Sequence, residues 1–200
     1  AFGAALTGSK FIKADMSGPT KPYYQDLTRL SRALAVSADF AMLTLGGELK
    51  RKELISARLG DLLSYLYLVS ATLKRYNDEG RKKEDFALVQ WSCQDHLYHC
   101  QRALADLINN MPSAPLRAML KIMLFPFGRP VRKPTDKLEH KLAHLLQVPS
   151  ETRNRLANYI YLKNEPLNLV GRQEQTLKDI LEVEPLFDKV CREKGVKQPF

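Results

Sequence analysis

Residues 86–111 read FALVQWSCQDHLYHCQRALADLINNM, and this stretch decides the fold class. Its apolar side chains recur at steps of three and four residues, which is the spacing of one buried face of an α-helix. They are Phe86, Val89, Cys93, Leu97, Cys100, Leu104, Leu107 and Met111. Pro112 follows, and helices usually end before a proline because the preceding residue disfavours the α conformation. The stretch therefore predicts a helix of about seven turns.

Two earlier stretches repeat this pattern. Apolar residues between 27 and 45 keep the same spacing up to Gly46-Gly47, a pair that suits a helix end and a turn. A second helix is expected to start near Glu48 or Glu53 and to close at residues 77–80. Alternating strand patterns are absent from the sequence. Long helices joined by short turns predict an all-α fold, an antiparallel helical bundle with a shorter, irregular helical extension.

The expected organisation has three regions. Residues 1–22 form an irregular lead-in, residues 23–111 supply three long bundle helices, and residues 112–200 form a basic, proline-interrupted helical extension that packs on the bundle. A fourth long helix should cover the open side of the bundle. It can come from residues 135–162, from residues 173–194, or from sequence upstream.

Several breaks are expected within the extension. Leu116–Phe125 reads as a short helix, and the prolines that follow make the next stretch irregular. Thr135-Asp136 can cap a helix that runs through Gln147 and ends at Val148-Pro149, and Ser150 can cap another. A last helix is expected from Gln173 to Val183, with Pro185 opening a final turn or two.

The net charge of +9 is unevenly placed along the chain. Residues 112–163 hold 10 Lys/Arg against 3 Asp/Glu, giving +7. Residues 1–111 hold 15 against 12, giving +3, and residues 164–200 hold 6 against 7, giving −1. This asymmetry points to an anionic partner such as lipid headgroups, nucleic acid or an acidic protein surface. The alternative is a solvated basic face that only aids solubility.

Membrane spanning and disulfide bonding are both disfavoured by the sequence. No apolar run approaches the ~18–20 residues of a membrane-spanning helix. Leu116–Phe127 is 12 residues long and is interrupted by Arg117, Lys121 and Pro126. The three cysteines are too few and too unpatterned for a disulfide scaffold, which favours a reducing compartment. We expect the chain in the cytosol or on the cytosolic face of a membrane.

Two groups of side chains suggest a metal site, and both are weak. Cys93, His96, His99 and Cys100 lie on one predicted helix, which cannot surround a tetrahedral zinc, and both cysteines fall on the apolar face. His140 and His144 have the i, i+4 spacing of zinc proteases, but Lys141 stands where the catalytic Glu should follow. No nucleophile motif or phosphate-binding loop is present either. We therefore assign no catalytic, cofactor-binding or metal residue to this chain.

The segment from Leu116 to Lys133 combines bulky apolar residues with clustered cations. This composition is typical of an element that contacts a membrane surface or a partner, because the apolar groups enter the headgroup boundary while the cations meet anionic lipid. The expected contact residues are Arg117, Lys121, Phe125, Phe127, Arg129, Arg132 and Lys133. The alternative is a short core helix followed by a solvated basic loop. Nucleic-acid binding ranks last, since no basic recognition helix or sheet-borne aromatic pair stands out.

Residues 30–61, LSRALAVSADFAMLTLGGELKRKELISARLGD, resemble the C-terminal region of FadE-type bacterial acyl-CoA dehydrogenases. The resemblance continues in separate blocks and covers about residues 22–195. The blocks lie within residues 66–80, at Gln94-Asp95 and Leu97-Tyr98, and within residues 125–129, 136–141 and 146–149. The block from Gly46-Gly47 to Asp61 is specific. The group of Cys93, His96, His99 and Cys100 departs from the family pattern.

The resemblance implies a parent enzyme that uses FAD to introduce a trans-2 double bond into fatty acyl-CoA, the first step of β-oxidation. The catalytic Glu of that family lies in upstream dehydrogenase domains, and no position here corresponds to it. The chain alone would then be no enzyme. Its partners would be the upstream domains, an anionic membrane surface, an electron-transfer partner or a second copy in a homodimer, and no nucleic acid. The implied location is the bacterial cytoplasm, peripheral on the inner membrane. The alternative is a purely structural bundle that completes the dehydrogenase fold.

Overall fold

The computed structural model describes residues 18–195, and the chain divides into two compact units after Leu142. The first seventeen residues of the expected lead-in therefore lie outside the described part. No strand occurs in residues 18–195, and every regular element there is helical. The expected all-α class is confirmed.

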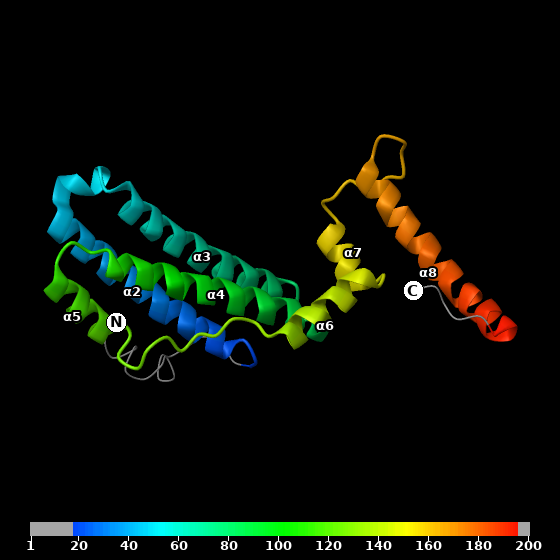
Figure 1. The fold of residues 1–200 in the computed structure, drawn as a ribbon, viewed down its shortest axis with the longest axis horizontal. Helices are drawn as coiled ribbons and strands as arrows, with labels where there is room; N and C mark the ends of the chain where they lie inside the picture. The colour runs from blue at the N-terminus through cyan, green and yellow to red at the C-terminus, as the bar shows by residue number, and fades with distance from the viewer. Residues whose placement is uncertain (1–17, 196–200) are drawn as a thin grey trace. The chain divides into compact units, whose positions relative to one another are not determined.

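Three long helices lie side by side and form the first unit (Figure 1). They are α2 (Lys21–Leu45), α3 (Glu53–Asp78) and α4 (Phe86–Asn109), and they run antiparallel in sequence order. Short 3₁₀ turns connect them, η1 (Gly46–Lys50) after α2 and η2 (Lys83–Asp85) after α3. Gly46 ends α2 at φ 50°, a left-handed backbone that a glycine adopts without strain.

The core of this unit lies along the predicted face of α4. Leu97, Leu104 and Leu107 are fully or almost fully buried there, and Leu62 and Leu73 of α3 are equally buried. Phe86, the first residue of the predicted face, is half-buried against the same core. Burying a leucine side chain stabilises a fold by about 1.5–3 kcal/mol, so this shared face holds the three helices together.

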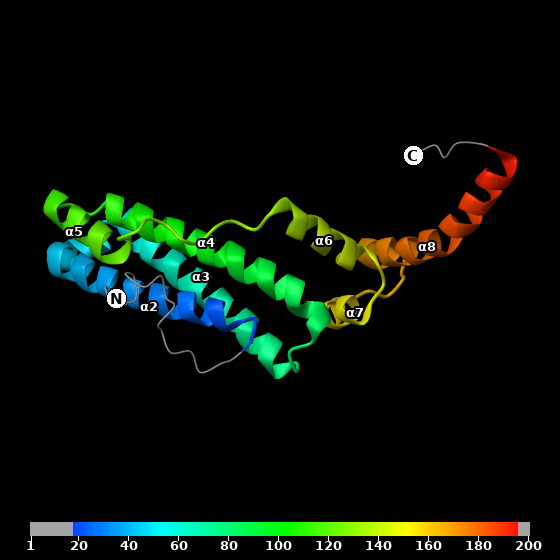
Figure 2. The ribbon, with the colours of Figure 1, turned by 90° about the horizontal axis from the view of Figure 1, so that it is seen from below.

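Helix α4 also buries a second strip of side chains. Gln101, Ala105 and Ile108 lie beside the predicted face and are all buried. The short helix α5 (Ala114–Leu124) packs on α4 and buries Leu116 and Leu120. The chain then runs back along the bundle to residue 135 without regular structure (Figure 2). A helix covered on two sides, such as α4, occupies the centre of its unit.

The outer side of α3 has no such cover within its unit. By length and composition α3 could cross a membrane, contrary to the sequence-based expectation that no such segment exists. One such helix is weak evidence of a membrane span; only 22% of the apolar window is buried, and Leu62, Leu66 and Val69 of α3 are buried in the core. We therefore describe α3 as a bundle helix with an apolar outer face.

The second unit begins within α6 (Asp136–Gln147) and continues through α7 (Glu151–Ala157) and α8 (Leu169–Lys194). Ser150 caps α7 by accepting a hydrogen bond from the Arg153 N–H at 3.2 Å, as its position predicted. The expected end of the preceding helix at Gln147 is confirmed. Because residues 148–150 separate α6 from α7, residues 135–162 do not supply one long fourth helix, which was one of three candidate sources.

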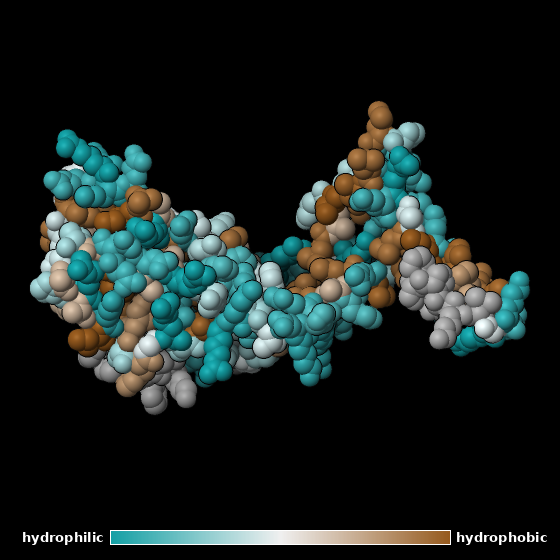
Figure 3. Space-filling view, viewed as in Figure 1, coloured by the Kyte–Doolittle hydropathy of each residue, from teal (hydrophilic) through white to brown (hydrophobic). Residues whose placement is uncertain are grey.

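Helix α8 corrects another expectation. It starts at Leu169 rather than Gln173 and runs through Pro185 as one helix of 26 residues. A proline inside a helix removes one backbone hydrogen bond, and an exposed helix can leave the freed carbonyl to water. Few of its residues are buried, and hydrophobic residues lie at the surface where the chain enters α8 (Figure 3). Those exposed residues include Ile160, Leu167 and Leu169.

Candidate functional site

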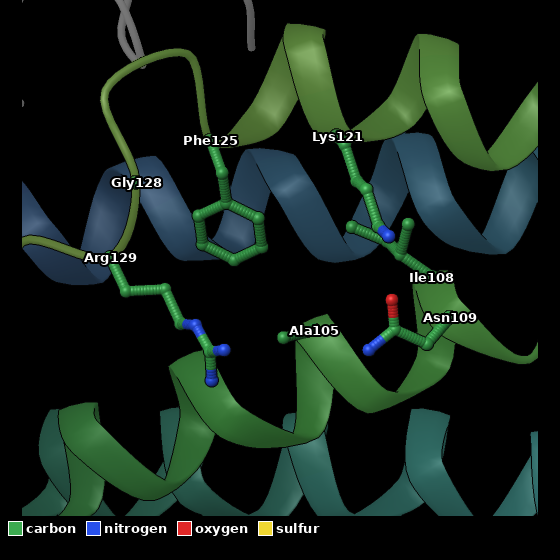
Figure 4. A pocket seen from close by; sticks show the side chains of 7 residues that line it. All are labelled: Ala105, Ile108, Asn109, Lys121, Phe125, Gly128 and Arg129. Atoms are coloured by element: carbon green, nitrogen blue, oxygen red, sulfur yellow. The ribbon is translucent and has the colours of Figure 1, made fainter.

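A hollow of about 320 Å³ lies in the first unit between the ends of α4 and α5 and the turn that follows α5. Figure 4 shows that three polar side chains from these three places point toward one space, with the Phe125 ring on its wall. Lys121 comes from α5, Arg129 from the turn and Asn109 from the last turn of α4. The lining residues are Ala105, Ile108, Asn109, Lys121, Phe125, Gly128 and Arg129.

A tight turn places Arg129 on this hollow. The N–H of Gly128 donates to the carbonyl oxygen of Phe125 at 3.1 Å, which closes a four-residue turn with Pro126 in its second position. Proline favours that position because its φ is already fixed near the required value. Gly128 has φ 79°, a backbone conformation that costs other residues about 1–2 kcal/mol. Local sequence therefore fixes the direction in which the chain leaves the turn.

A buried side chain holds the segment that leaves the turn. The Gln101 amide donates to the carbonyl oxygen of Val131 at 3.1 Å, and its side-chain oxygen accepts from the Val131 N–H at 3.1 Å. Gln101 is 1% exposed, so both hydrogen bonds are shielded from water on its side. This pair anchors residues 129–133 to the centre of α4.

The hollow is electrically positive. None of its seven lining residues is acidic, and two of them are cations. Within residues 18–195 neither Lys121 nor Arg129 forms an ion pair. Lys121 and Arg129 are exposed to solvent, and the floor of Ala105 and Ile108 beside them is buried.

The structure separates the seven residues predicted for membrane or partner contact. Lys121, Phe125 and Arg129 meet at the hollow, while Phe127 is 79% exposed outside it. Arg132 and Lys133 are exposed beyond the Val131 anchor. Arg117 instead donates to the carbonyl oxygen of Met111 at 2.7 Å, just after the end of α4. Their contact role stays a prediction.

Four residues of the hollow were not among the predicted contact residues, namely Gly128 of the turn and three residues of α4. Ala105, Ile108 and Asn109 come from α4, at the i, i+3, i+4 spacing of one helical face. They lie beside the predicted core face rather than on it. The sequence signal that could have found them is the small residue Ala105 and the apolar residue Ile108, which form a strip of α4 next to that face.

The cysteines and histidines of α4 occupy separate environments. Burial raises the pKa of both Cys93 and Cys100 to about 12, so both are neutral thiols in the core. His96 lies within 2.6 Å of the Ser92 carbonyl oxygen, and His99 stacks on Tyr65. His140 and His144 are both exposed on α6. Within residues 18–195 no three His, Cys, Asp or Glu side chains are grouped to hold a metal ion.

A second surface, the outer face of α3, is apolar and uncharged. Between Asp61 and Lys74 the sequence carries no charged residue, although only one side of α3 faces the core. Leu63 is 59% exposed and Tyr67 is 70% exposed on the outer side. An exposed apolar strip of this kind is typical of a surface that packs against another protein.

The family model described as acyl-CoA dehydrogenase, C-terminal, bacterial type matches residues 1–198. No solved structure matches the chain. Because the family match spans nearly all of the sequence, the chain belongs to the bacterial-type acyl-CoA dehydrogenase C-terminal family.

Proposed function

We propose that this chain is the non-catalytic helical C-terminal region of an FAD-dependent fatty acyl-CoA dehydrogenase, and that it docks the enzyme on the anionic inner membrane. The family membership supports the parent activity. In this proposal the upstream dehydrogenase domains carry the FAD and the catalytic Glu of the first step of β-oxidation. The hollow of about 320 Å³ is at the small end of ligand pockets and does not fit a dinucleotide such as FAD.

One observation carries the docking proposal: the exposed Phe127 side chain lies in a segment with unpaired cations on a fixed anchor. Phe127 is 79% exposed, and Arg132 and Lys133 are exposed after the Val131 anchor. An aromatic ring suits the headgroup boundary, and each basic residue near an anionic surface contributes about 1 kcal/mol. Because Gln101 already orders the segment, little conformational entropy is lost on docking.

Vesicle flotation tests this function. The chain should float with phosphatidylglycerol vesicles at low salt and stay behind with phosphatidylcholine vesicles. The double variant Arg132→Gln/Lys133→Gln should bind roughly thirtyfold less, since it removes about 2 kcal/mol of surface attraction. A matched control is Lys82→Gln/Lys83→Gln, which removes the same charge beside the acidic residues Glu84 and Asp85. Absence of flotation, or equal losses in both double variants, contradicts membrane docking.

The outer face of α3 favours a second function, that of a structural bundle that completes the dehydrogenase fold or its dimer. Tyr67 and Leu63 are exposed on a face without charge. If that face packs against protein, Tyr67→Glu should separate this region from its partner, because it places a charge in an apolar interface. Light scattering of the parent enzyme would detect the change in mass. Lys74→Glu, on the charged end of the same helix, is the control.

A further inference from the structure

We propose that the hollow between α4, α5 and the 125–128 turn is a binding site for one phosphate group. Lys121, Arg129 and Asn109 would hold the phosphate oxygens, and the group attached to the phosphate would lie along the Phe125 ring. The ligand class is a phosphate ester, whether it is a lipid headgroup or a soluble small molecule. This inference does not depend on membrane docking by Phe127, Arg132 and Lys133.

The donors of the hollow match the chemistry of phosphate. Arg129 offers a planar fork of N–H donors, Lys121 a compact ammonium, and Asn109 a neutral carboxamide. Each comes from a different element, so the donors reach one space from different directions, as Figure 4 shows. A tetrahedral phosphate presents acceptor oxygens in several directions at once, and charge-assisted hydrogen bonds to it are about twice as strong as neutral ones.

The charge of the site has no competing partner in the described protein. Within residues 18–195 neither cation has an ion pair, and none of the lining residues is acidic. An anion entering the hollow would therefore displace water and not a carboxylate. This differs from Arg153 of the second unit, whose guanidinium is already held by both oxygens of Glu174.

The walls of the hollow limit what can bind. Ala105 and Ile108 form an apolar floor, 8% and 0% exposed, and the half-buried Phe125 ring closes one side. A volume of about 320 Å³ accepts a phosphate with a small attached group. The Gly128 turn and the Gln101 anchor fix the backbone on both sides of Arg129, whose side chain is exposed.

Titration of the chain with inorganic phosphate and with glycerol 3-phosphate tests the site. Binding is followed by NMR at the Gly128 N–H and the Asn109 side-chain amide. Saturable binding of one ion is expected, and Lys121→Met or Arg129→Gln should each weaken it about tenfold or more, since each removes a charge-assisted hydrogen bond. Lys133→Met is the control outside the hollow and should change affinity less than twofold. Acetate at the same ionic strength should bind more weakly, because it has two oxygens and one charge.

Two results overturn the proposal: no saturable phosphate binding in the unaltered chain, or equal losses in Lys121→Met and Lys133→Met while circular dichroism shows both folded. Phosphatidylglycerol vesicles identify the source of the phosphate. If Lys121→Met also weakens vesicle binding, the site takes a lipid headgroup; if only the soluble phosphates are affected, it takes a soluble ester. Failure of membrane docking is separate, because it appears in flotation of Arg132→Gln/Lys133→Gln and leaves phosphate titration unchanged.

Discussion

The side chain of Gln101 and the main chain of Val131 exchange two hydrogen bonds of 3.1 Å, although 30 residues separate them. The Gln101 side chain both donates and accepts in this pair, as the main chain of an adjacent β-strand does when two residues exchange hydrogen bonds. Because Gln101 is buried in α4, it ties an irregular segment to the helix of the unit that has the most buried residues. The position of residues 129–133 therefore depends on the side-chain amide of Gln101.

Replacing that amide should destabilise the first unit. Gln101→Ala leaves the N–H and carbonyl of half-buried Val131 without partners, at a cost of about 1–3 kcal/mol. Urea denaturation measures the free energy of unfolding. Gln90→Ala, on the same helix, replaces a half-buried side chain that forms no hydrogen bond among residues 18–195 and should stay within about 0.5 kcal/mol. Equal losses in the two variants would show that the pair contributes nothing specific.

Two helical glycines should respond oppositely to alanine. A Cβ on Gly171 would lie 2.1 Å from the Lys163 carbonyl oxygen, so Gly171→Ala must shift the backbone that enters α8. A Cβ on Gly60 of α3 would meet nothing within 4 Å, and Gly60→Ala should stabilise the chain by about 0.5–1 kcal/mol through helix propensity.

Thermal unfolding followed by circular dichroism separates the two glycine variants. Gly171→Ala is expected to lower the transition of the second unit by several degrees, since an unavoidable backbone clash costs about 1–3 kcal/mol. The Asn168 side chain, which accepts from the Gly171 N–H at 3.2 Å, would lose its cap geometry at the same time. A stabilising effect of Gly171→Ala would mean that this approach of the two backbones is absent in solution.

The bundle was predictable from the sequence because its pattern is long and regular. Seven of the eight residues predicted on the α4 face, from Val89 to Met111, are buried in the structure. Periodicity of this kind directly records burial of one face. It did not reveal the second buried strip of α4, since Gln101 is polar and Ala105 is small, and neither stands out in a search for large apolar residues.

The candidate site was only partly predictable for the same reason. Composition identified Lys121, Phe125 and Arg129 as neighbours in sequence, but their meeting with Asn109 depends on how α5 folds back on α4. Arg117 shared the same composition and was predicted with them, yet its guanidinium is hydrogen-bonded to the Met111 carbonyl. Clustered charge predicts a region, whereas tertiary packing decides which cations converge.

The core thiols should be almost unreactive while the chain is folded. Burial raises the pKa of Cys93 and Cys100 from 9.0 to about 12, and the thiolate is the reactive form. Well below both values, this shift leaves roughly a thousandfold less thiolate than an ordinary cysteine has. Mass spectrometry after brief alkylation near pH 8 should find both unmodified. The same treatment in guanidinium is the control and should modify them. Rapid labelling of the folded chain would place these thiols in contact with water.

The Arg153–Glu174 pair should make the second unit sensitive to acid. Both Glu174 oxygens accept from the Arg153 guanidinium, which joins α7 to α8, and this hydrogen bonding lowers the pKa of Glu174 from its ordinary value of 4.5. A carboxyl whose pKa is lower in the folded state contributes stability above its unfolded pKa and loses it as the pH falls through the folded pKa. The unfolding temperature of the second unit should therefore decrease when the pH is lowered below about 4.5, and Glu174→Gln should remove much of that dependence while lowering stability at neutral pH.

Glu182→Gln, on the same helix and outside any ion pair among residues 18–195, is the matched control and should keep the acid dependence. Urea unfolding of the three proteins at neutral and acidic pH makes the comparison, and identical pH profiles for all three would mean that the pair does not join the two helices in solution.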